Sequence, residues 1–218
     1  MSRPPESSFF NGHVDALSDI HFIHEIIQYI SNFDVALDIG AHVGIWSRRL
    51  AEKFKTVVAF EPVPDHIECW QKNMENFLKE NSDWGNYTTL HKIALGHENG
   101  TSTMRVPNTT NTGMASLVYE GDFGKAQRWV QPNWDKFPNI EIEIKTLDSY
   151  EFEKLDFIKM DVEWFERRVL QGAEQTIKKH RPIMYIEMHD AQAFKLMNDW
   201  GYKIICSHSM NRLYKSIK

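Results

Sequence analysis

Side chains that can move protons lie at the ends of two apolar runs. The stretch "DFIKMDVEWFE" (156–166) places Asp161 and Glu163 after buried-type residues, and "IMYIEMHD" does the same for Glu187 and His189. A carboxylate can accept a proton or orient a hydroxyl, and histidine, with an unperturbed pKa of about 6.5, can act as a base near neutral pH. Such oxygen and nitrogen atoms can also bind a metal, but their spacing does not require one, and no metal is expected.

Each of these residues also has an ordinary structural interpretation. Asp161 could cap the helix that follows it, and Glu163 could complement the first turn of that helix or pair with Arg167 four residues on. Glu187 could serve the start of the next helix, a role to which Asp190 is already suited. Both interpretations stay open at the level of sequence.

A glycine-containing loop follows another apolar run, in "VALDIGAHVGIWS". It contains Asp38, Gly40, Ala41 and Gly44, small residues that let a backbone approach a ligand before the free N–H groups of a helix start. Glu61 ends the next run, where an acid can accept hydrogen bonds from ribose hydroxyls. The pattern indicates a nucleoside-containing ligand, with a plain tight turn as the alternative. The G-x-x-x-G spacing disfavours a nicotinamide cofactor.

The elements that must position these residues alternate between strands and helices. Such alternation predicts a mainly parallel sheet covered on both faces, with ligands bound beyond the carboxyl ends of its strands. The expected strands are 35–40, 56–61, 88–95, 156–161, 183–188, 202–207 and 212–217, and the expected helices are 14–31, 44–54, 64–81, 165–180 and 191–199.

The stretch 100–147 interrupts this alternation with short β-like pieces separated by turn signals. Within it, 119–139 has no period and carries several aromatic residues, Trp129 and Trp134 among them. Such a long loop is either a lid or binding surface, or it packs on the sheet edge. If the two tryptophans are exposed, they favour an oligomer or partner interface.

The bulk composition favours one globular domain over residues 1–218, with an N-terminal tail and helix over 1–34. The net charge is −5 and no block of Lys and Arg stands out, which argues against nucleic acid or an anionic membrane as partner. The chain has two cysteines, Cys69 and Cys206, and neither a signal-like start nor a spanning apolar run. We therefore expect a cytoplasmic protein with reduced thiols.

The order of several motifs is more specific than any one of them. "ALDIGAHVGIWS", "VVAFEPVPDHIECWQKNMEN", "IALG", "TGMASL", "KTLDSY", "DFIKMDVEWFERRVLQGAE" and "RPIMYIE" follow one another closely. Together, over about 35–188, they resemble the FkbM family of S-adenosylmethionine-dependent methyltransferases. The resemblance implies a class I (Rossmann-like) fold with a seven-stranded sheet whose last strand is antiparallel. It also implies methyl transfer, usually to a hydroxyl of a sugar or natural product.

The resemblance also implies roles for the motif residues. The loop residues Asp38, Gly40 and Gly44 would flank the methionine part of S-adenosylmethionine, and Glu61 would hold its ribose. Ile93 and Ala94, at the end of the third expected strand, fall where the adenine pocket of the family is expected.

Methyl transfer to a hydroxyl requires a positioned nucleophile and a group that takes its proton. Asp161, at the rim nearest the transferred methyl and against the cofactor, is the first candidate, with His189 as the next base and Glu187 beside it. On the acceptor side, Ser116 and Asn111 of "NTGMASL" would contact ligands, unless that stretch is a plain turn. His42, in the glycine loop, faces either substrate or solvent.

Trp164 departs from the family pattern, which usually has glycine after Asp-Val-Glu. Either the turn does not need the freedom of glycine, or the indole, next to Glu163, lines the acceptor pocket. The leading hypothesis is O-methylation of a sugar or other small acceptor. The alternatives are N-methylation and a catalytically silent cofactor-binding module.

Overall fold

The computed structural model describes residues 22–81, 87–107, 113, 115–117 and 136–217, and its centre is a seven-stranded sheet. The strand order is β10-β11-β9-β8-β1-β2-β3, with β11 antiparallel to both neighbours and the other neighbouring pairs parallel. The strands are β1 (Val35–Ile39), β2 (Thr56–Phe60), β3 (Tyr87–His91), β8 (Phe157–Met160), β9 (Ile183–Glu187), β10 (Tyr202–His208) and β11 (Asn211–Ser216). This is the predicted α/β architecture.

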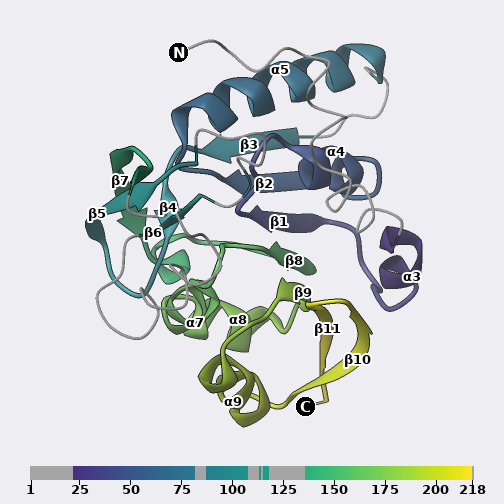
Figure 1. Cartoon of the computed structure of the whole chain (residues 1–218). Coiled ribbons are helices and arrows are strands. Elements are labelled where there is room, and N and C mark those ends of the chain that lie inside the picture. The colour runs from purple at the N-terminus through teal and green to yellow at the C-terminus, as the bar shows by residue number, and fades with distance from the viewer. Residues whose placement is uncertain (1–21, 82–86, 108–112, 114, 118–135, 218) are drawn as a thin grey trace.

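Helices cover both faces of this sheet (Figure 1). They are α3 (Ile23–Ile27), α4 (Ile45–Ala51), α5 (Pro64–Glu80), α7 (Glu166–Gln171), α8 (Glu174–His180) and α9 (Ala191–Asp199). Alternate strand residues point to opposite faces, and in β1 this sends Ala36 to a core with α3, α4 and α5, and Leu37 to a core with α7, α8 and α9. No helix within the described ranges is long and apolar enough to cross a membrane.

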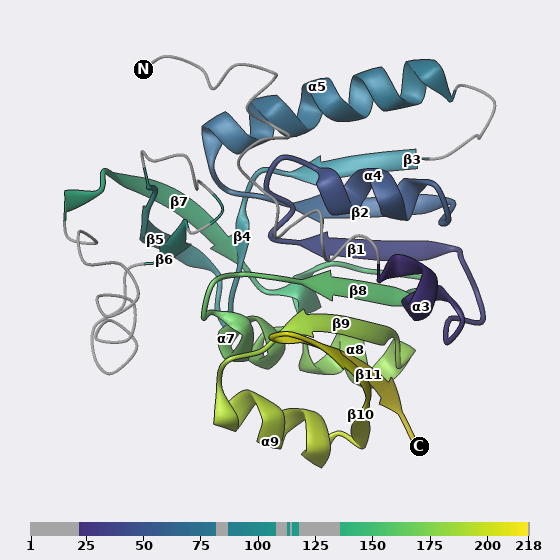
Figure 2. The same ribbon diagram turned by 45° about the vertical axis from the view of Figure 1, so that its right-hand side comes forward.

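The insertion over 100–147, together with the short strand β4 before it, forms a second, small sheet in the order β4-β7-β5-β6. Its strands are β4 (Ala94–Leu95), β5 (Gly100–Arg105), β6 (Ser116–Leu117) and β7 (Asn139–Lys145). The prediction of one strand over 88–95 is therefore wrong: β3 ends at His91, and the chain crosses to pair Ala94 in parallel with Ile144. In Figure 2 the arrowheads of β1, β2, β8 and β9 point towards this small sheet.

Three predicted helices also differ from the structure: the one over 44–54 is the shorter α4, and the other two differ more. The helix over 165–180 divides into α7 and α8 at Gly172, where a Cβ would lie 1.9 Å from the carbonyl oxygen of Gly96. That close approach of two backbones turns the chain. Of the helix over 14–31, the described part contains only α3, which ends at Ile27, and residues 1–21 lie outside the described residues.

Candidate functional site

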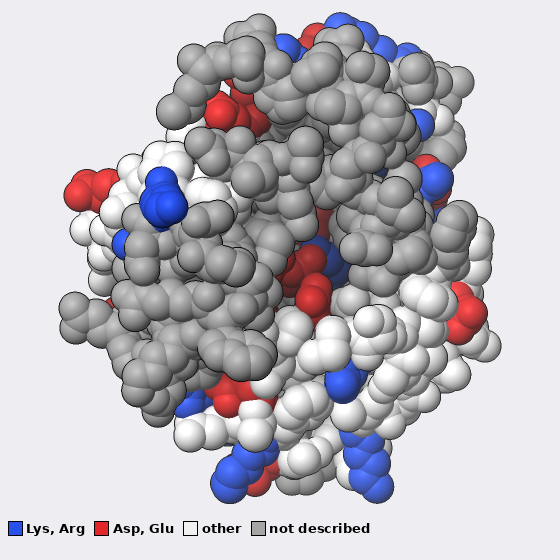
Figure 3. All heavy atoms as spheres, in the orientation of Figure 1, with Lys and Arg blue, Asp and Glu red and all other residues white. Residues whose placement is uncertain are grey.

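A cavity of about 410 Å³ opens at the carboxyl ends of β1, β2, β8 and β9. It is lined by residues from both halves of the chain, including Gly40, Ala41, His42, Glu61, Ile93, Ala94, Lys159, Asp161, Glu163, Trp164, Glu187 and His189. Figure 3 shows acidic side chains in a hollow near the middle of one face, with a basic group behind them. The cavity therefore brings together residues that the sequence separates by well over 100 positions.

The glycines of the first loop are required by the packing of the protein itself. Gly40 has φ +76°, and a Cβ there would lie 1.8 Å from the backbone oxygen of Asp161. Gly44 has φ +90° and is the N-cap residue of α4, and a Cβ there would lie 2.8 Å from the ring of Trp70. Gly40 and Ala41 line the cavity, whereas Gly44 is not among its lining residues.

Asp38 lies beneath the loop and is fully buried. Its Oδ2 accepts a hydrogen bond from Ser47 Oγ at 2.5 Å, and Ser47 accepts one from the indole N–H of Trp70 at 2.8 Å. Burial raises the pKa of Asp38, and the nearby Lys159 ammonium opposes that rise. Its Oδ1 has no hydrogen-bond partner among the described residues. Asp38 is thus an anchor of the loop, and it is not a lining residue.

Glu61 is buried on the cavity wall. It accepts hydrogen bonds from the backbone N–H groups of His42 (2.8 Å) and Val63 (2.9 Å), and it contacts His66 Nδ1 at 3.2 Å. A carboxylate has about four acceptor positions, so these three contacts fix the side chain and leave room for one ligand hydroxyl. The next part of the wall is apolar, with Ile93 and Ala94 buried in it.

Lys159 is a site residue that sequence reasoning missed. It lies in the middle of β8, is 4% exposed, and its Nζ is 3.4 Å from Asp161 Oδ2. Burial alone would lower the pKa of Lys159, but the carboxylates of Asp161, Asp38 and Glu187 outweigh it and raise the pKa. A lysine inside an apolar strand was the available signal, because lysine is almost never buried unless paired.

Asp161 faces the cavity, with 34% of its side chain exposed there. Burial by the walls raises its pKa, and the adjacent Lys159 ammonium opposes the rise. The capping interpretation of Asp161 is wrong, because α7 begins at Glu166 and its N-cap residue, Phe165, makes no side-chain cap. Within the described chain Asp161, Glu187 and His189 do not form a metal-ligating group, and Lys159 supplies the cationic charge beside Asp161.

Glu187 and His189 form a pair at the end of β9, the strand beside β8, with 3.0 Å between Glu187 Oε1 and His189 Nε2. This hydrogen bond lowers the pKa of Glu187 and raises the pKa of His189. Neither is needed to start α9, because Asp190 accepts from the N–H of Gln192 at 2.7 Å, as predicted. Glu187 and His189 therefore do not cap α9, and both line the cavity.

Trp164 occupies a turn that does use the conformation favoured by glycine. Its φ is 75°, and that of Glu163 is 49°, so the interpretation that this turn has no need of positive φ is wrong. The indole lines the cavity and stacks on the His189 ring, with 4.3 Å between centroids and 16° between planes. Ser116 Oγ donates to the carbonyl of Glu163 at 2.7 Å and so supports this turn from β6, without lining the cavity.

Two carboxyls of this turn and of the helix start after it, Glu163 and Glu166, have raised pKa values. Burial raises the pKa of Glu163 well above its usual range, and the neighbouring carboxylates of Asp161 and Glu187 add to the rise. Burial likewise raises the pKa of Glu166 to about 8, and Glu166 Oε1 accepts the N–H of Trp164 at 3.0 Å. Sequence reasoning missed Glu166 because an acidic residue in the first turn of a helix is usually exposed to solvent, where it complements the helix dipole.

Some residues with a predicted role lie outside the described residues. They are Asn111 and the stretch 118–135, which includes Trp129 and Trp134. The prediction of a lid, binding surface or oligomer interface over 119–139 therefore stays a prediction.

The strand order, the antiparallel β11 and a cavity at the carboxyl ends of the parallel strands define a class I methyltransferase fold. The family described as Methyltransferase FkbM domain matches residues 38–204. The chain belongs to this family of methyltransferases, as its motifs predict.

Individual relatives agree with this assignment. Methyltransferase 1 of Beauveria bassiana (strain ARSEF 2860) is 25% identical over 183 residues, which cover 72% of this chain and 68% of that protein. The crystal structure of Methyltransferase FkbM from Methylobacillus flagellatus KT matches with a TM-score of 0.58 and 19% identity. The match covers 95% of this chain but 52% of that one, so this chain spans about half the length of that protein, and the likeness is one of fold.

Proposed function

We propose that the protein transfers a methyl group from S-adenosylmethionine to a hydroxyl of a sugar or another small acceptor. The observation that carries the proposal is the joining of two sets of residues in one cavity. One set is the glycine loop with Glu61, and the other is the Glu187–His189 pair beneath the indole of Trp164. The first set suits a nucleoside cofactor, and the second suits an acceptor that must lose a proton.

The residues present fit S-adenosylmethionine. Glu61 keeps an acceptor position for a ribose hydroxyl, and Ile93 and Ala94 give an apolar wall suited to a base. Asp38 Oδ1, beneath the glycine loop, is a buried acceptor with no hydrogen-bond partner among the described residues, a state that buried polar atoms rarely show without a reason. The carboxylates of Asp161 and Glu187 favour a cationic sulfonium nearby. When bound, S-adenosylmethionine would supply an electrophilic methyl group.

On the acceptor side, His189 is the proposed general base. Glu187 holds the His189 ring by a 3.0 Å hydrogen bond and raises its pKa, which makes the neutral imidazole a better proton acceptor. Asp161, itself held by Lys159, would orient the acceptor hydroxyl. The Trp164 indole offers an aromatic face of the kind that packs on the apolar face of a sugar ring.

N-methylation is the second candidate, and the acidic lining favours it. The carboxylates of Asp161 and Glu187 would attract a protonated amine as well as a sulfonium. His189 would then deprotonate the amine before transfer. The two candidates differ in the acceptor alone, so a panel of hydroxylated and amino acceptors separates them.

The first experiment is calorimetric titration of the full chain with S-adenosylmethionine, with NAD as the comparison ligand. We expect binding of S-adenosylmethionine in the micromolar range and none of NAD. Glu61→Gln should weaken that binding at least about tenfold, since a charged acceptor is replaced by a neutral one. The exposed Glu98→Gln is the matched control.

A protein that binds neither ligand would contradict the cofactor assignment. Binding without turnover on a panel of sugars, small alcohols and amines would favour the silent binding module. Transfer that survives His189→Gln with an unchanged rate would remove His189 as the base.

A further inference from the structure

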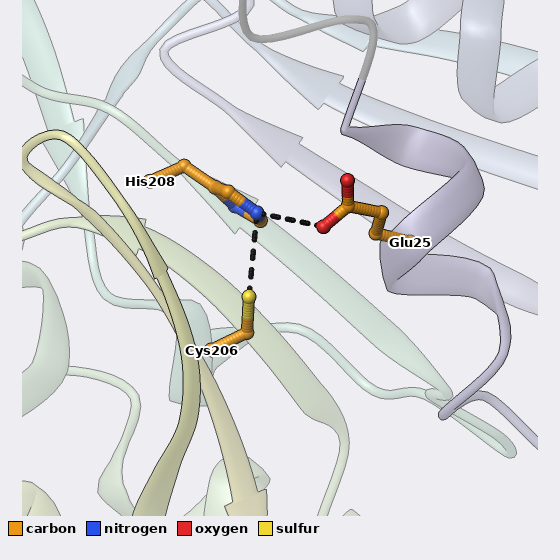
Figure 4. Close-up of side chains that lie close together, drawn as sticks. All are labelled: Glu25, Cys206 and His208. Carbon is orange, nitrogen blue, oxygen red and sulfur yellow. Dashed lines mark hydrogen bonds and ion pairs between the residues drawn. The ribbon is translucent and has the colours of Figure 1, made fainter.

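A second cluster of ligand-type side chains lies outside the cavity lining, between α3 and β10. Glu25 comes from α3, and Cys206 and His208 come from β10 (Figure 4). His208 Nε2 lies 3.1 Å from Glu25 Oε2 and 3.3 Å from Cys206 Sγ. Glu25 and His208 are 183 residues apart in the chain. Tertiary folding alone brings a carboxylate, a thiol and an imidazole to one point.

The arrangement is poorly explained by hydrogen bonds. Figure 4 shows the carboxylate and the sulfur approaching the same ring nitrogen of His208 from different sides. That nitrogen carries at most one proton. It cannot donate well to both Glu25 and Cys206, and a relay through the ring would need one contact on Nδ1. A cation held by all three lone-pair donors would satisfy them together.

The distances match the edges of a tetrahedral zinc site. With Zn–S near 2.3 Å and Zn–N and Zn–O near 2.0 to 2.2 Å, tetrahedral ligands lie about 3.5 Å (N to S) and about 3.4 Å (N to O) apart. The observed 3.3 Å and 3.1 Å are within a few tenths of an ångström of these values. The three ligand atoms all lie within 4.8 Å of one another. Thiolate, imidazole and carboxylate together are a donor set suited to zinc.

The surroundings of His208 hold its ring in place for such a role. Its side chain is 9% exposed, and the Phe22 ring stacks on it with 3.6 Å between centroids. The other ring nitrogen, Nδ1, lies 3.4 Å from the hydroxyl of Tyr185. A partner on the second nitrogen is what a metal-binding histidine usually has, because it fixes the ring orientation.

We infer that Glu25, Cys206 and His208 bind a zinc ion, which cross-links α3 to the hairpin formed by β10 and β11. Three protein ligands leave one coordination position for water. The exposed Glu25, with 58% of its side chain accessible, gives the ion a path from solvent. The ion would also support the cavity indirectly. Its ligand His208 contacts Tyr185, and Tyr185 packs on Trp46, a cavity-lining residue, with 5.5 Å between ring centroids.

The test uses the full chain stripped of metal and titrated with Zn²⁺, followed by metal analysis after gel filtration. We expect about one zinc per chain, and a melting temperature that rises by about 5 °C or more at zinc concentrations 100-fold above Kd. With Co²⁺ as the probe, a thiolate-to-cobalt absorption band should appear in the unmutated chain.

Two variants and one matched control decide the assignment. Cys206→Ser should abolish the cobalt–thiolate band and weaken zinc binding at least about 100-fold, and the exposed Glu25→Gln should weaken it at least about tenfold, in line with losing ligands. Cys69→Ser, which changes the other cysteine, should keep both the band and the affinity. The same proteins are also titrated with S-adenosylmethionine. This second titration measures the cofactor site independently, so a failure to bind zinc can be told apart from a failure of the proposed methyl transfer.

A full chain that retains no zinc and shows no zinc-dependent rise in melting temperature would overturn the inference. So would equal losses in Cys69→Ser and Cys206→Ser. Glu25→Gln changes an exposed side chain, so a folded variant is available even if the cysteine variant is unstable.

Discussion

Glu166 shows at the residue scale how burial changes the pH dependence of this fold. Its carboxyl is fully buried, and its pKa is about 8 in the folded chain against a usual 4.5. The folded state therefore holds a proton that the unfolded state releases between about pH 4.5 and pH 8. Stability falls as pH rises through that window, and the full cost is present above it.

We predict that Glu166→Gln, which mimics the protonated form, removes this loss. Relative to the unmutated chain, the variant should gain free energy of unfolding as pH rises from 5.5 to 8.5, by at most about 3 kcal/mol. Urea unfolding at both pH values measures the difference. The exposed Glu98→Gln serves as control, and the same pH dependence in all three proteins would contradict the assigned pKa.

His189 carries the second prediction at this scale. The hydrogen bond that the His189 ring donates to Glu187 is the largest cause of the raised pKa of His189, while burial acts in the opposite direction. NMR titration should therefore give a His189 pKa above 6.5, and Glu187→Gln should lower it because burial then dominates. If His189 is the base, the acidic limb of kcat/KM should move to lower pH in the same variant. An unchanged titration in Glu187→Gln would show that the pair does not control the ring.

At the scale of elements, the turn from β8 to α7 is the strained part of the site. Consecutive positive φ values at Glu163 and Trp164 cost of order 1 to 3 kcal/mol for each non-glycine residue. The strain persists because Ser116 and Glu166 hold the turn by hydrogen bonds on either side. An observed outlier of this kind, on a cavity wall, points to a functional reason for the side chain.

Trp164→Gly should therefore separate stability from acceptor recognition. Glycine relieves the strain, so we expect the free energy of unfolding to hold or to rise by about 1 kcal/mol. Loss of the indole stacked on His189 should raise KM for the acceptor at least about tenfold and leave cofactor affinity unchanged. Thermal unfolding, acceptor kinetics and cofactor titration measure the three quantities. A lower KM would mean that the indole obstructs the pocket.

The loop after β1 gives a sharper test of backbone packing. In Gly40→Ala the new Cβ would lie 1.8 Å from the Asp161 carbonyl oxygen at a φ of +76°. We expect a loss of at least about 3 kcal/mol in unfolding free energy and of cofactor binding, because β1 and β8 must separate. Gly100→Ala, where a Cβ would meet nothing within 4 Å, is the control. Equal stability in the two variants would contradict this account.

At the scale of the whole molecule, a buried charge cluster links strands from distant parts of the chain. Lys159 of β8 lies in register with Asp38 of β1 and with Tyr185 of β9. The carboxylates of Asp38, Asp161 and Glu187 raise its pKa, so they keep it charged although it is buried. The same charges therefore affect both the stability of the folded sheet and the electric field inside the cavity.

We predict that Lys159→Met destabilises the chain by about 3 to 5 kcal/mol at pH 7.5, because Asp38 and Asp161 lose their buried counter-ion. The deficit should shrink towards pH 5, since the carboxyls, with pKa values already raised by burial, can then protonate. Unfolding in urea at the two pH values measures it. The exposed Lys145→Met, which removes a surface ion pair with Glu143, should cost less than about 1 kcal/mol.

Much of the architecture was predictable because it depends on local periodicity. Apolar runs such as 35–40 and 183–188 gave the parallel strands, and the carboxyl ends of those strands located Asp161, Glu187 and His189 on one cavity. The division of 165–180 at Gly172 was not predictable, because it depends on the backbone of Gly96, which is far away in sequence.

The sequence by itself determined the α/β class, the family and the edge of the sheet where ligands bind. The tertiary structure alone decided which buried charges face each other, that Trp164 takes a positive φ, and that Glu25 meets His208 across 183 residues. The physical reason is that hydrophobic period and turn chemistry act over a few residues. Partners such as Lys159 and Asp38 are set by strand register, which forms only when distant segments pack together.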